Sequence, residues 1–372
     1  PSTAEPLAGP AEKRSGEFMS QNGNYNGNAN GNGNGAKPPM IRVGVIGYGY
    51  WGPNVVRNFF GVDHTCVEML CDMNPSALAR AKKNYPSLQV TTDPDEILKS
   101  AKIDAVAIVT PVWTHYKLAK TALENGKHVF VEKPFTSSSE QAEELIELAA
   151  RKNLKIMVDH TFLFTGAVRK IRELTESGAL GDLYYYDSLR VNLGLFQHDV
   201  SVIWDLAPHD LSIMDHLIKG EPEAIVATGE CHLNGVEDVA FMTIYFPNNV
   251  IAHINVNWLS PVKIRMTMIG GQKKMLVWND LVADEKIRVY DKGVNITSGD
   301  KVRELLVNYR SGDMWAPQLE QLEALRVELD YFADCILQDK SPFNDGQAGL
   351  RVVRMLEAAD RSIKQRGELV RL

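Results

Sequence analysis

The sequence predicts an α/β fold in which a doubly wound parallel sheet is followed by an α+β domain with a large, mostly antiparallel open sheet. Three observations lead to this prediction. Short apolar runs alternate with helical segments up to about residue 160, as in successive βαβ units. A glycine-rich turn follows the first apolar run. Beyond residue 160, longer runs alternate apolar and polar residues with few helices between them, as in a one-sided antiparallel sheet.

The first domain is expected over residues 40–160. Its short apolar runs predict strands, at 41–47, 66–71, 90, 105–110, 128–132 and 155–158. Helices are predicted between the strands, at 53–60, 75–84, 94–100, 114–125 and 139–151. Asn74 is the expected N-cap of the second helix, and Gly126 is the expected glycine after the end of the fourth.

The second domain is expected over residues 161–372. A helix at 166–176 opens it, and strand-like runs follow, at 183–191, 224–232, 239–246, 250–258, 263–269 and 274–278. One helix at 206–218 interrupts these runs. Helices at 318–337 and 346–365 close the chain, the last of them able to pack back against the first domain.

Composition excludes several classes of protein. The 372 residues suffice for two domains and a tail, and 40 basic against 47 acidic residues leave a net charge of −7 without a basic run, which argues against nucleic-acid binding. Four cysteines without a Cys-x-x-Cys pair predict free buried thiols in a reducing cytosol. Because no run suits a membrane span or a signal peptide, we expect a cytoplasmic protein without a membrane partner.

Residues 1–39 are expected to form a disordered tail. The segment 22–35 reads NGNYNGNANGNGNG, which cannot bury enough apolar surface to offset the entropy of folding. Met19 and Met40 both have the character of translation starts, so part of the tail is a candidate artefact of gene prediction.

Residues 47–52 fit the G-x-G-x-x-G pattern of a dinucleotide-binding turn. They read Gly-Tyr-Gly-Tyr-Trp-Gly, follow a buried strand and open a helix, which is the context that the pattern requires. Gly47 permits the tight turn, Gly49 lets the backbone approach a pyrophosphate, and Gly52 lets helix and strand pack closely. The N–H groups at the helix N-terminus would then bind the phosphates.

Asp72 lies 20 residues after Gly52, at the end of the second predicted strand. A carboxylate at this place accepts hydrogen bonds from ribose hydroxyls and repels a 2′-phosphate, which favours NAD over NADP as the cofactor. The alternative interpretation is a glycine-rich turn with an incidental aspartate.

Several motifs together resemble the Gfo/Idh/MocA family of oxidoreductases, named after glucose–fructose oxidoreductase, inositol dehydrogenase and rhizopine catabolism. They are the glycine turn, Thr110-Pro111 with His115, Glu132-Lys133-Pro134 after a strand, and Asp205-x-x-x-His209. The resemblance implies a Rossmann domain, NAD or NADP as the cofactor, and oxidation of a secondary alcohol of a sugar, cyclitol or nucleotide sugar. It also implies a homodimer or homotetramer formed through the sheet face.

The resemblance also assigns residues to the cofactor and the substrate. Around the cofactor it places the glycine turn with Tyr48, Tyr50 and Trp51, then Thr110, Pro111, His115, Glu132 and Lys133. The segment 192–209 is similar to a subgroup that includes UDP-N-acetylglucosamine-type 3-dehydrogenases. Asn192 and Gln197 could therefore contact substrate, or could be ordinary loop residues. Residues 159–162 read Asp-His-Thr-Phe where many members have glycine and later arginine, so His160 is a candidate at the substrate rim.

Oxidation of an alcohol needs a base and a charge near the developing alkoxide. Lys133 follows a strand end, where a doubly wound sheet binds its ligand, and could stabilise the alkoxide. Asp205 and His209, four residues apart, share a helix face, with His209 as the base and Asp205 orienting substrate or Lys133. Because Pro208 is tolerated in a first turn, we expect the helix to begin near Asp205, with its dipole keeping His209 neutral. Asp210 points about 100° away from His209 and is expected to be structural.

Interpretations without a catalytic role remain open for these residues. Lys133 could be a solvated surface lysine, and Asp205 an N-cap beside a structural histidine. The sequence has no H-x-x-E-H or similar spacing, so no catalytic metal is expected. Besides an NAD-dependent dehydrogenase, the alternatives are an enzyme that recycles tightly bound NAD, an NAD-dependent glycoside hydrolase, or a non-catalytic NAD-sensing protein.

Overall fold

The computed structural model describes residues 39–194, 200–233, 235–297 and 306–372. The predicted disordered tail lies, apart from Pro39, outside the described residues. Residues Pro39–Leu372 form one compact unit with two sheets. No helix in the part of the chain that the structure describes is long and apolar enough to cross a membrane.

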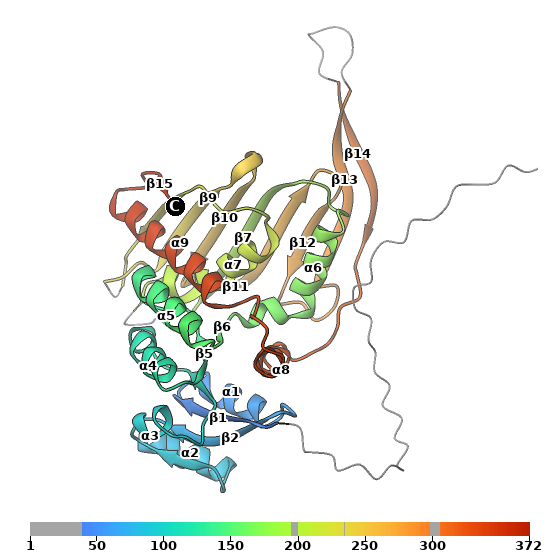
Figure 1. The fold of residues 1–372 in the computed structure, drawn as a ribbon. Helices are drawn as coiled ribbons and strands as arrows, with labels where there is room; N and C mark the ends of the chain where they lie inside the picture. Colours follow the sequence, from blue (N-terminus) through green and yellow to red (C-terminus); the bar gives the residue numbers. More distant parts are fainter. Residues whose placement is uncertain (1–38, 195–199, 234, 298–305) are drawn as a thin grey trace, which may run out of the picture. The chain divides into compact units, whose positions relative to one another are not determined.

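The first sheet is fully parallel, in the order β3-β2-β1-β4-β5-β6 (Figure 1). Its strands are β1 (Ile41–Ile46), β2 (Thr65–Cys71), β3 (Gln89–Thr91), β4 (Ala105–Ile108), β5 (His128–Glu132) and β6 (Ile156–Asp159). The connecting helices are α1 (Gly52–Phe59), α2 (Pro75–Asn84), α3 (Asp95–Leu98), α4 (Val112–Glu124) and α5 (Ser139–Lys152). This is the predicted doubly wound fold, and the strand order reverses between β1 and β4, where such sheets bind ligands.

Local signals placed these elements within a few residues of their observed ends. The Asn74 side chain accepts a hydrogen bond from the Ser76 N–H at 2.9 Å, which confirms the predicted N-cap of α2. Gly126 after α4 has a φ of +74°, a conformation that favours glycine. The apolar runs became buried strands because both faces of a parallel sheet are covered.

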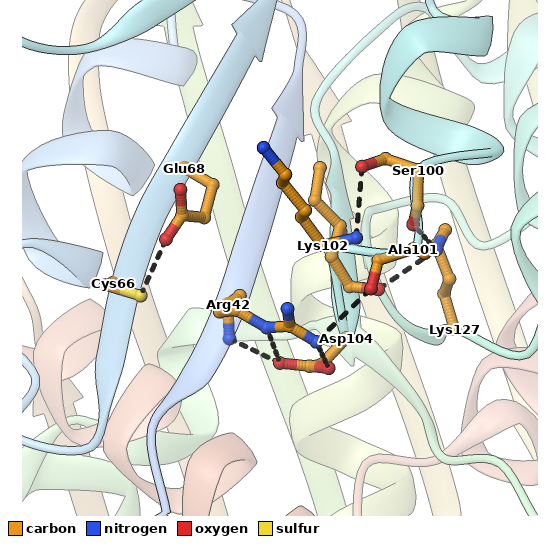
Figure 2. Close-up of polar contacts among 9 residues, drawn as sticks. Arg42, Cys66, Glu68, Ser100, Ala101, Lys102, Asp104 and Lys127 are labelled. Atoms are coloured by element: carbon orange, nitrogen blue, oxygen red, sulfur yellow. Dashed lines mark hydrogen bonds and ion pairs between the residues drawn. The ribbon is translucent and has the colours of Figure 1, made fainter.

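Polar contacts fasten the amino-terminal edge of this sheet (Figure 2). Arg42 at the start of β1 donates to the Asp104 carboxylate from Nε at 2.8 Å and from Nη2 at 2.6 Å. Lys127, just before β5, donates to the carbonyls of Ser100 and Ile103 at 2.5 and 2.9 Å. These contacts join β1, β4 and β5 at the edge opposite their carboxyl ends, so they leave the ligand-binding edge free.

The second sheet has nine strands in the order β14-β13-β12-β11-β7-β10-β9-β8-β15. They are β7 (Leu183–Leu193), β8 (Ala224–Glu230), β9 (Val239–Tyr245), β10 (Ile251–Asn257), β11 (Leu259–Gly271), β12 (Met275–Asn279), β13 (Ile287–Thr297), β14 (Leu306–Trp315) and β15 (Val370–Arg371). Only the β7–β10 pair is parallel among the described pairs, so the predicted mostly antiparallel sheet is confirmed.

Three long helices lie against one face of this sheet (Figure 1): α6 (Gly166–Glu176), α7 (Val202–Leu217) and α9 (Gly346–Lys364). Their apolar side chains share one core with the strands. The helix α8 (Ala324–Leu337) instead packs into the core of β1 and α1, through Leu325, Leu329 and Phe332. The chain therefore returns to the first sheet after completing the second.

Several predicted boundaries were wrong. The helix expected to begin near Asp205 begins at Val202, with Ser201 before it, so Pro208 lies inside the helix and Asp205 is not the N-cap. The last-but-one helix begins at Ala324 rather than at residue 318. The strands β13 and β14 were missed.

The four cysteines are free thiols, as predicted, but they are not all buried. Cys71 and Cys335 are buried, Cys66 is half-buried, and Cys231 is exposed beyond the end of β8. The expectation of buried thiols was therefore wrong for Cys231.

Candidate active site

The glycine turn between β1 and α1 has the geometry that its pattern requires. Gly47 has a φ of +105°, and a Cβ there would lie 2.1 Å from the Val109 carbonyl oxygen. A Cβ on Gly52 would lie 2.4 Å from the Gly47 carbonyl oxygen, so only glycine allows α1 to start this close to the turn. A Cβ on Gly49, by contrast, would meet no atom within 4 Å among the described residues. That open space beside an exposed backbone fits a pyrophosphate at the N-terminus of α1.

Asp72, at the carboxyl end of β2, braces this turn. Its carboxylate accepts the Tyr48 N–H at 2.6 Å and the Asn74 N–H at 2.7 Å. A carboxylate has about four lone-pair positions, so capacity remains for ribose hydroxyls. The Tyr48 ring is buried in the core, whereas Tyr50 is 88% exposed. Of these two side chains, only that of Tyr50 is therefore accessible to a ligand.

Trp51 is held by a contact that the sequence did not reveal. Its indole Nε1 donates to Asp159 Oδ2 at 2.8 Å, across 108 residues of chain. Asp159 ends β6. Its side chain therefore ties the glycine turn to β6.

His115 joins the loop after β4 to the loop after β5. Its buried ring contacts the carbonyl oxygens of Thr110 at 2.7 Å and Pro134 at 3.0 Å, and burial lowers its pKa. Thr110 also shares a hydrogen bond with Thr114 at 2.6 Å, and Pro111 precedes α4. Both nitrogens of His115 thus face carbonyl oxygens, and the neutral ring donates a hydrogen bond to one of them, so His115 joins the two loops.

Lys133, which follows β5 of the first sheet, contacts Asp205 of α7, which packs against the second sheet. Lys133 Nζ donates to the Asp205 carbonyl oxygen at 2.8 Å and lies 3.5 Å from Asp205 Oδ1. The Lys133 side chain is only 13% exposed, so it is not a solvated surface lysine. Trp258 Nε1 donates to the other carboxylate oxygen of Asp205 at 3.3 Å. The carboxylate is thereby fixed between a cation and an indole.

His209 lies one turn further along α7, partly exposed, with its ring 4.9 Å from that of Phe162. Burial lowers the pKa of His209 well below its ordinary value, and the nearby cations of Lys133, Arg190 and Arg265 lower it further. The imidazole is therefore neutral at pH 7, as predicted. The predicted cause was wrong, because burial rather than the helix dipole dominates and His209 is not in the first turn.

Asp210, the neighbour of His209, is structural as expected. It is 2% exposed and accepts Arg190 Nε at 2.6 Å and Ser188 Oγ at 2.7 Å. The Arg190 guanidinium also lies over the Phe162 ring, with Cζ 4.6 Å from the centroid. Arg190 and Phe162 thus shape the wall beside His209, although neither carries a sequence motif that would have identified it.

Glu132 belongs to a set of three buried carboxyl groups with Asp159 and Glu328. Glu132 and Asp159 are register partners on β5 and β6, and Glu328 comes from α8. Burial, together with Asp159, raises the pKa of both Glu132 and Glu328 well above the ordinary value. Each of these two acids therefore keeps its proton to a higher pH than an ordinary glutamate does. No His, Cys, Asp and Glu group that could hold a metal occurs among the described residues.

The predicted substrate residues are only partly brought together. His160 is 1% exposed, and it interacts electrostatically with Lys133 and His209. Asn192 lies half-buried near the carboxyl end of β7. Gln197 lies outside the described residues.

Comparison with protein families gives two matches. A family described as "Oxidoreductase family, NAD-binding Rossmann fold" matches residues 41–160, and the GFO/IDH/MocA C-terminal domain matches residues 168–277. A UDP-N-acetylglucosamine 3-dehydrogenase of Acidithiobacillus ferrooxidans is 27% identical over 322 residues, covering 84% of this chain and 94% of that protein. A scyllo-inositol 2-dehydrogenase (NAD(+)) of Bacillus subtilis is 25% identical, covering 81% and 88%.

Solved structures share the fold. The UDP-N-acetylglucosamine 3-dehydrogenase from A. ferrooxidans superposes with a TM-score of 0.74 at 25% identity, covering 88% of this chain and 98% of that one. A levoglucosan dehydrogenase in complex with NADH and L-sorbose gives a TM-score of 0.76 at 19% identity, covering 90% and 99%. At that lower identity the likeness extends to the fold alone.

Proposed function

The chain belongs to the Gfo/Idh/MocA family of NAD-dependent oxidoreductases, and we propose that it oxidises a secondary alcohol of a nucleotide sugar. The observation that carries this proposal is the group formed by Lys133, Asp205 and His209 beside the carboxyl ends of the parallel strands. A neutral imidazole, a buried ammonium and a fixed carboxylate are the groups that oxidation of an alcohol requires.

Each residue has a distinct role in this proposal. His209 accepts the hydroxyl proton, for which it must be neutral. Lys133 donates a hydrogen bond to the substrate oxygen and stabilises its developing negative charge, and Asp205 holds Lys133 in position. NAD, when bound, supplies the acceptor for the hydride. Gly47, Gly49, Gly52 and Asp72 would hold it, with the pyrophosphate beside Gly49 and the ribose at Asp72.

The choice of a nucleotide sugar is supported by the relative that covers both domains. The A. ferrooxidans protein named UDP-N-acetylglucosamine 3-dehydrogenase matches 94% of its own length to this chain. The B. subtilis scyllo-inositol 2-dehydrogenase matches nearly as far, so cyclitols are the competing substrates. His160 and Asn192 are the described residues proposed for the substrate side of the site.

The test is the appearance of NADH absorbance when the protein is mixed with NAD⁺ and separate pools of UDP-sugars, free sugars and inositols. Production with the UDP-sugar pool alone is the expected result. Production with inositols alone would contradict the substrate class and retain the reaction type. No production with any pool, together with NADH already bound to the purified protein, would point to a recycled cofactor instead.

We also propose that the chain forms a homodimer or homotetramer through the open face of the second sheet. The register places Phe241, Tyr245, Ile251 and Met268 on the face opposite the helices, and each is 37–41% exposed. Exposed apolar side chains gathered on one face of a sheet are a feature of protein–protein interfaces, which supports this face as the contact surface. Light scattering should give a mass of two or four chains, and Phe241→Asp should lower it. A monomeric wild-type protein would contradict this proposal.

A further inference from the structure

A polar cavity of about 230 Å³ is lined by residues of α6, α7, α9 and the short 3-10 helix η1 (Thr161–Phe164). Its polar lining residues are His160, Arg172, Ser212, Asp215, His216 and Arg351. None of Lys133, Asp205 and His209 lines it, so the cavity is separate from the proposed catalytic group. Its volume has room for several water molecules or for one small organic ion.

Two arginines in this lining have donors that the protein does not use. Arg351 donates to Asp215 from Nε and Nη2 at 2.8–3.1 Å, and its Nη1 has no partner among the described residues. Arg172 donates from Nε to Glu176 at 2.8 Å and from Nη1 to His216, and its Nη2 has no partner in the described part of the chain. Both side chains are 38–39% exposed, so a ligand can reach them from solvent.

His216 has a ring donor without an acceptor. Both of its ring nitrogens lie 2.7–2.8 Å from Arg172 Nη1, and a guanidinium nitrogen can only donate. Burial, and next to it Arg172, lowers the pKa of His216 to about 4, so at pH 7 the ring is neutral and carries one N–H. One ring nitrogen accepts from Arg172, and the N–H of the other finds no acceptor among the described residues. His160, which is 1% exposed, likewise has no partner there for either ring nitrogen.

The cavity lacks free acceptors as well as negative charge. Asp215 is the only carboxylate among the described residues that line it, and Arg351 already binds both of its oxygens. With neutral histidines, two arginines against one aspartate leave the lining a formal charge of +1. Glu176, which also contacts Arg172, does not line the cavity and is 54% exposed, so its charge is screened by water and salt. A ligand with negative charge and several acceptor atoms fits this lining.

We propose that this cavity binds a small oxyanion, a phosphate or a carboxylate, as a ligand distinct from NAD and from the substrate. Arg172 and Arg351 donate to the oxyanion from their unused nitrogens, and His216 donates from its ring N–H. Charge-assisted hydrogen bonds from arginine are typical of phosphate and carboxylate sites. The proposal does not rest on the proposed function, since none of the proposed catalytic residues takes part.

Calorimetric titration with inorganic phosphate, and separately with malonate, tests the site in the full chain. Saturating NAD⁺ keeps phosphate out of the glycine turn, and sodium chloride at equal ionic strength controls for unspecific attraction. We expect one anion to bind per chain with at least one probe, and the preferred probe identifies the oxyanion. No saturable binding of either probe would overturn the proposal. UDP at saturation should leave the anion affinity unchanged, whereas competition would place the cavity within the substrate site and overturn a separate one.

Two variants remove different features of the site. Arg172→Gln removes a free donor and a charge, and Ala348→Leu fills the cavity without changing its charge. Each should weaken anion binding about tenfold or more, as loss of a hydrogen bond to a charged group does. Arg169→Gln is the matched control and should bind like wild type, because Arg169 lies on the same helix as Arg172 but pairs with Glu320 and does not line the cavity. Unchanged affinity in Arg172→Gln, or an equal loss in Arg169→Gln, would overturn the site, with thermal unfolding in the absence of anion as the check that each variant is folded.

Discussion

At the scale of single residues, the proposed site requires a histidine that is buried enough to stay neutral but exposed enough to reach a substrate. The Nδ1 atom of His209 is inaccessible to solvent, whereas the residue as a whole is partly exposed. Burial is the largest cause of its lowered pKa, and Lys133 is the next. Lys133, proposed to stabilise the alkoxide, thus also lowers the pKa of His209, the proposed base, so the two proposed roles reinforce each other.

The lowered pKa of His209 predicts the pH dependence of turnover. A base acts when neutral, so kcat/KM should stay constant as the pH falls through 6.5, the ordinary histidine value, and decline only at more acidic pH. Arg265→Gln removes one of the cations that lower this pKa, and should move the acidic limb upward. The check is a pH–rate profile of both proteins, and a wild-type limb centred near 6.5 would contradict the buried environment.

Removal of the base gives a second prediction at this scale. His209→Ala should lower kcat by about 10²–10⁴, because a positioned general base contributes that much to the rate. The glycine turn lies on other elements, so the dissociation constant for NAD should not change, as titration by fluorescence would show. Turnover equal to that of wild type would show that His209 is not the base.

At the scale of elements, α7 carries a proline inside the helix, in the turn whose backbone binds Lys133. Pro208 has no N–H to offer the Trp204 carbonyl, so the helix loses one hydrogen bond in the turn that carries Asp205 and His209. In the same turn the Asp205 carbonyl oxygen accepts Lys133 Nζ at 2.8 Å. Lys133 is thus held by the backbone as well as by the carboxylate of this helix.

The turn between β1 and α1 gives a matched pair of predictions. Gly52→Ala places a Cβ 2.4 Å from the Gly47 carbonyl oxygen, so α1 must shift and the thermal unfolding temperature should fall. Gly49→Ala meets no atom within 4 Å among the described residues, so stability should be unchanged while NAD binding weakens about tenfold or more. Calorimetry and NAD titration separate the two effects. Unchanged NAD affinity in Gly49→Ala would show that the pyrophosphate does not bind beside Gly49.

Most of the parallel half could be predicted from the sequence because its signals are local. Apolar runs, Asn74 and Gly126 fix the strands and helix ends within a few residues. The errors arose where packing between distant elements outweighs local preference. The start of α7 was misplaced because Pro208 lies inside this well-packed helix instead of in its first turn. The contact of Trp51 with Asp159 and the ion pair of Arg190 with Asp210 leave no local signal, since they depend on how distant strands are arranged.

At the scale of the whole molecule, buried carboxyl groups couple distant parts of the chain. Glu132 of β5, Asp159 of β6 and Glu328 of α8 meet where Trp51 of the glycine turn also bonds. Glu328 Oε1 further accepts Asn344 Nδ2 at 3.0 Å, just before α9. Three ionised carboxylates would repel one another in this space, so protons on Glu132 and Glu328 stabilise the junction, which is why burial and Asp159 raise the pKa of both.

This requirement makes global stability depend on pH. The pKa of Glu328 is higher in the folded state than in the unfolded chain, so folded protein binds more protons above the unfolded value. The free energy of unfolding therefore falls as the pH rises above about 4.3 toward the folded pKa, by up to about 1.4 kcal/mol per pH unit. Glu323, at the start of the same helix α8, has the opposite shift. Arg57 and Asn58 lower its pKa to about 2, so its stabilisation is present above the unfolded pKa and lost in acid.

The two glutamates therefore predict opposite outcomes for the same substitution. Glu328→Gln keeps the acceptor for His160 N–H and Asn344 and needs no proton, so its unfolding temperature should exceed that of wild type at pH 8 and approach it near pH 4. Glu323→Gln should instead lower the unfolding temperature at pH 8, with the difference vanishing as the pH falls toward about 2. Thermal denaturation across this range checks both. If Glu328→Gln were less stable than wild type at pH 8, the raised pKa of Glu328 in the folded protein would be contradicted.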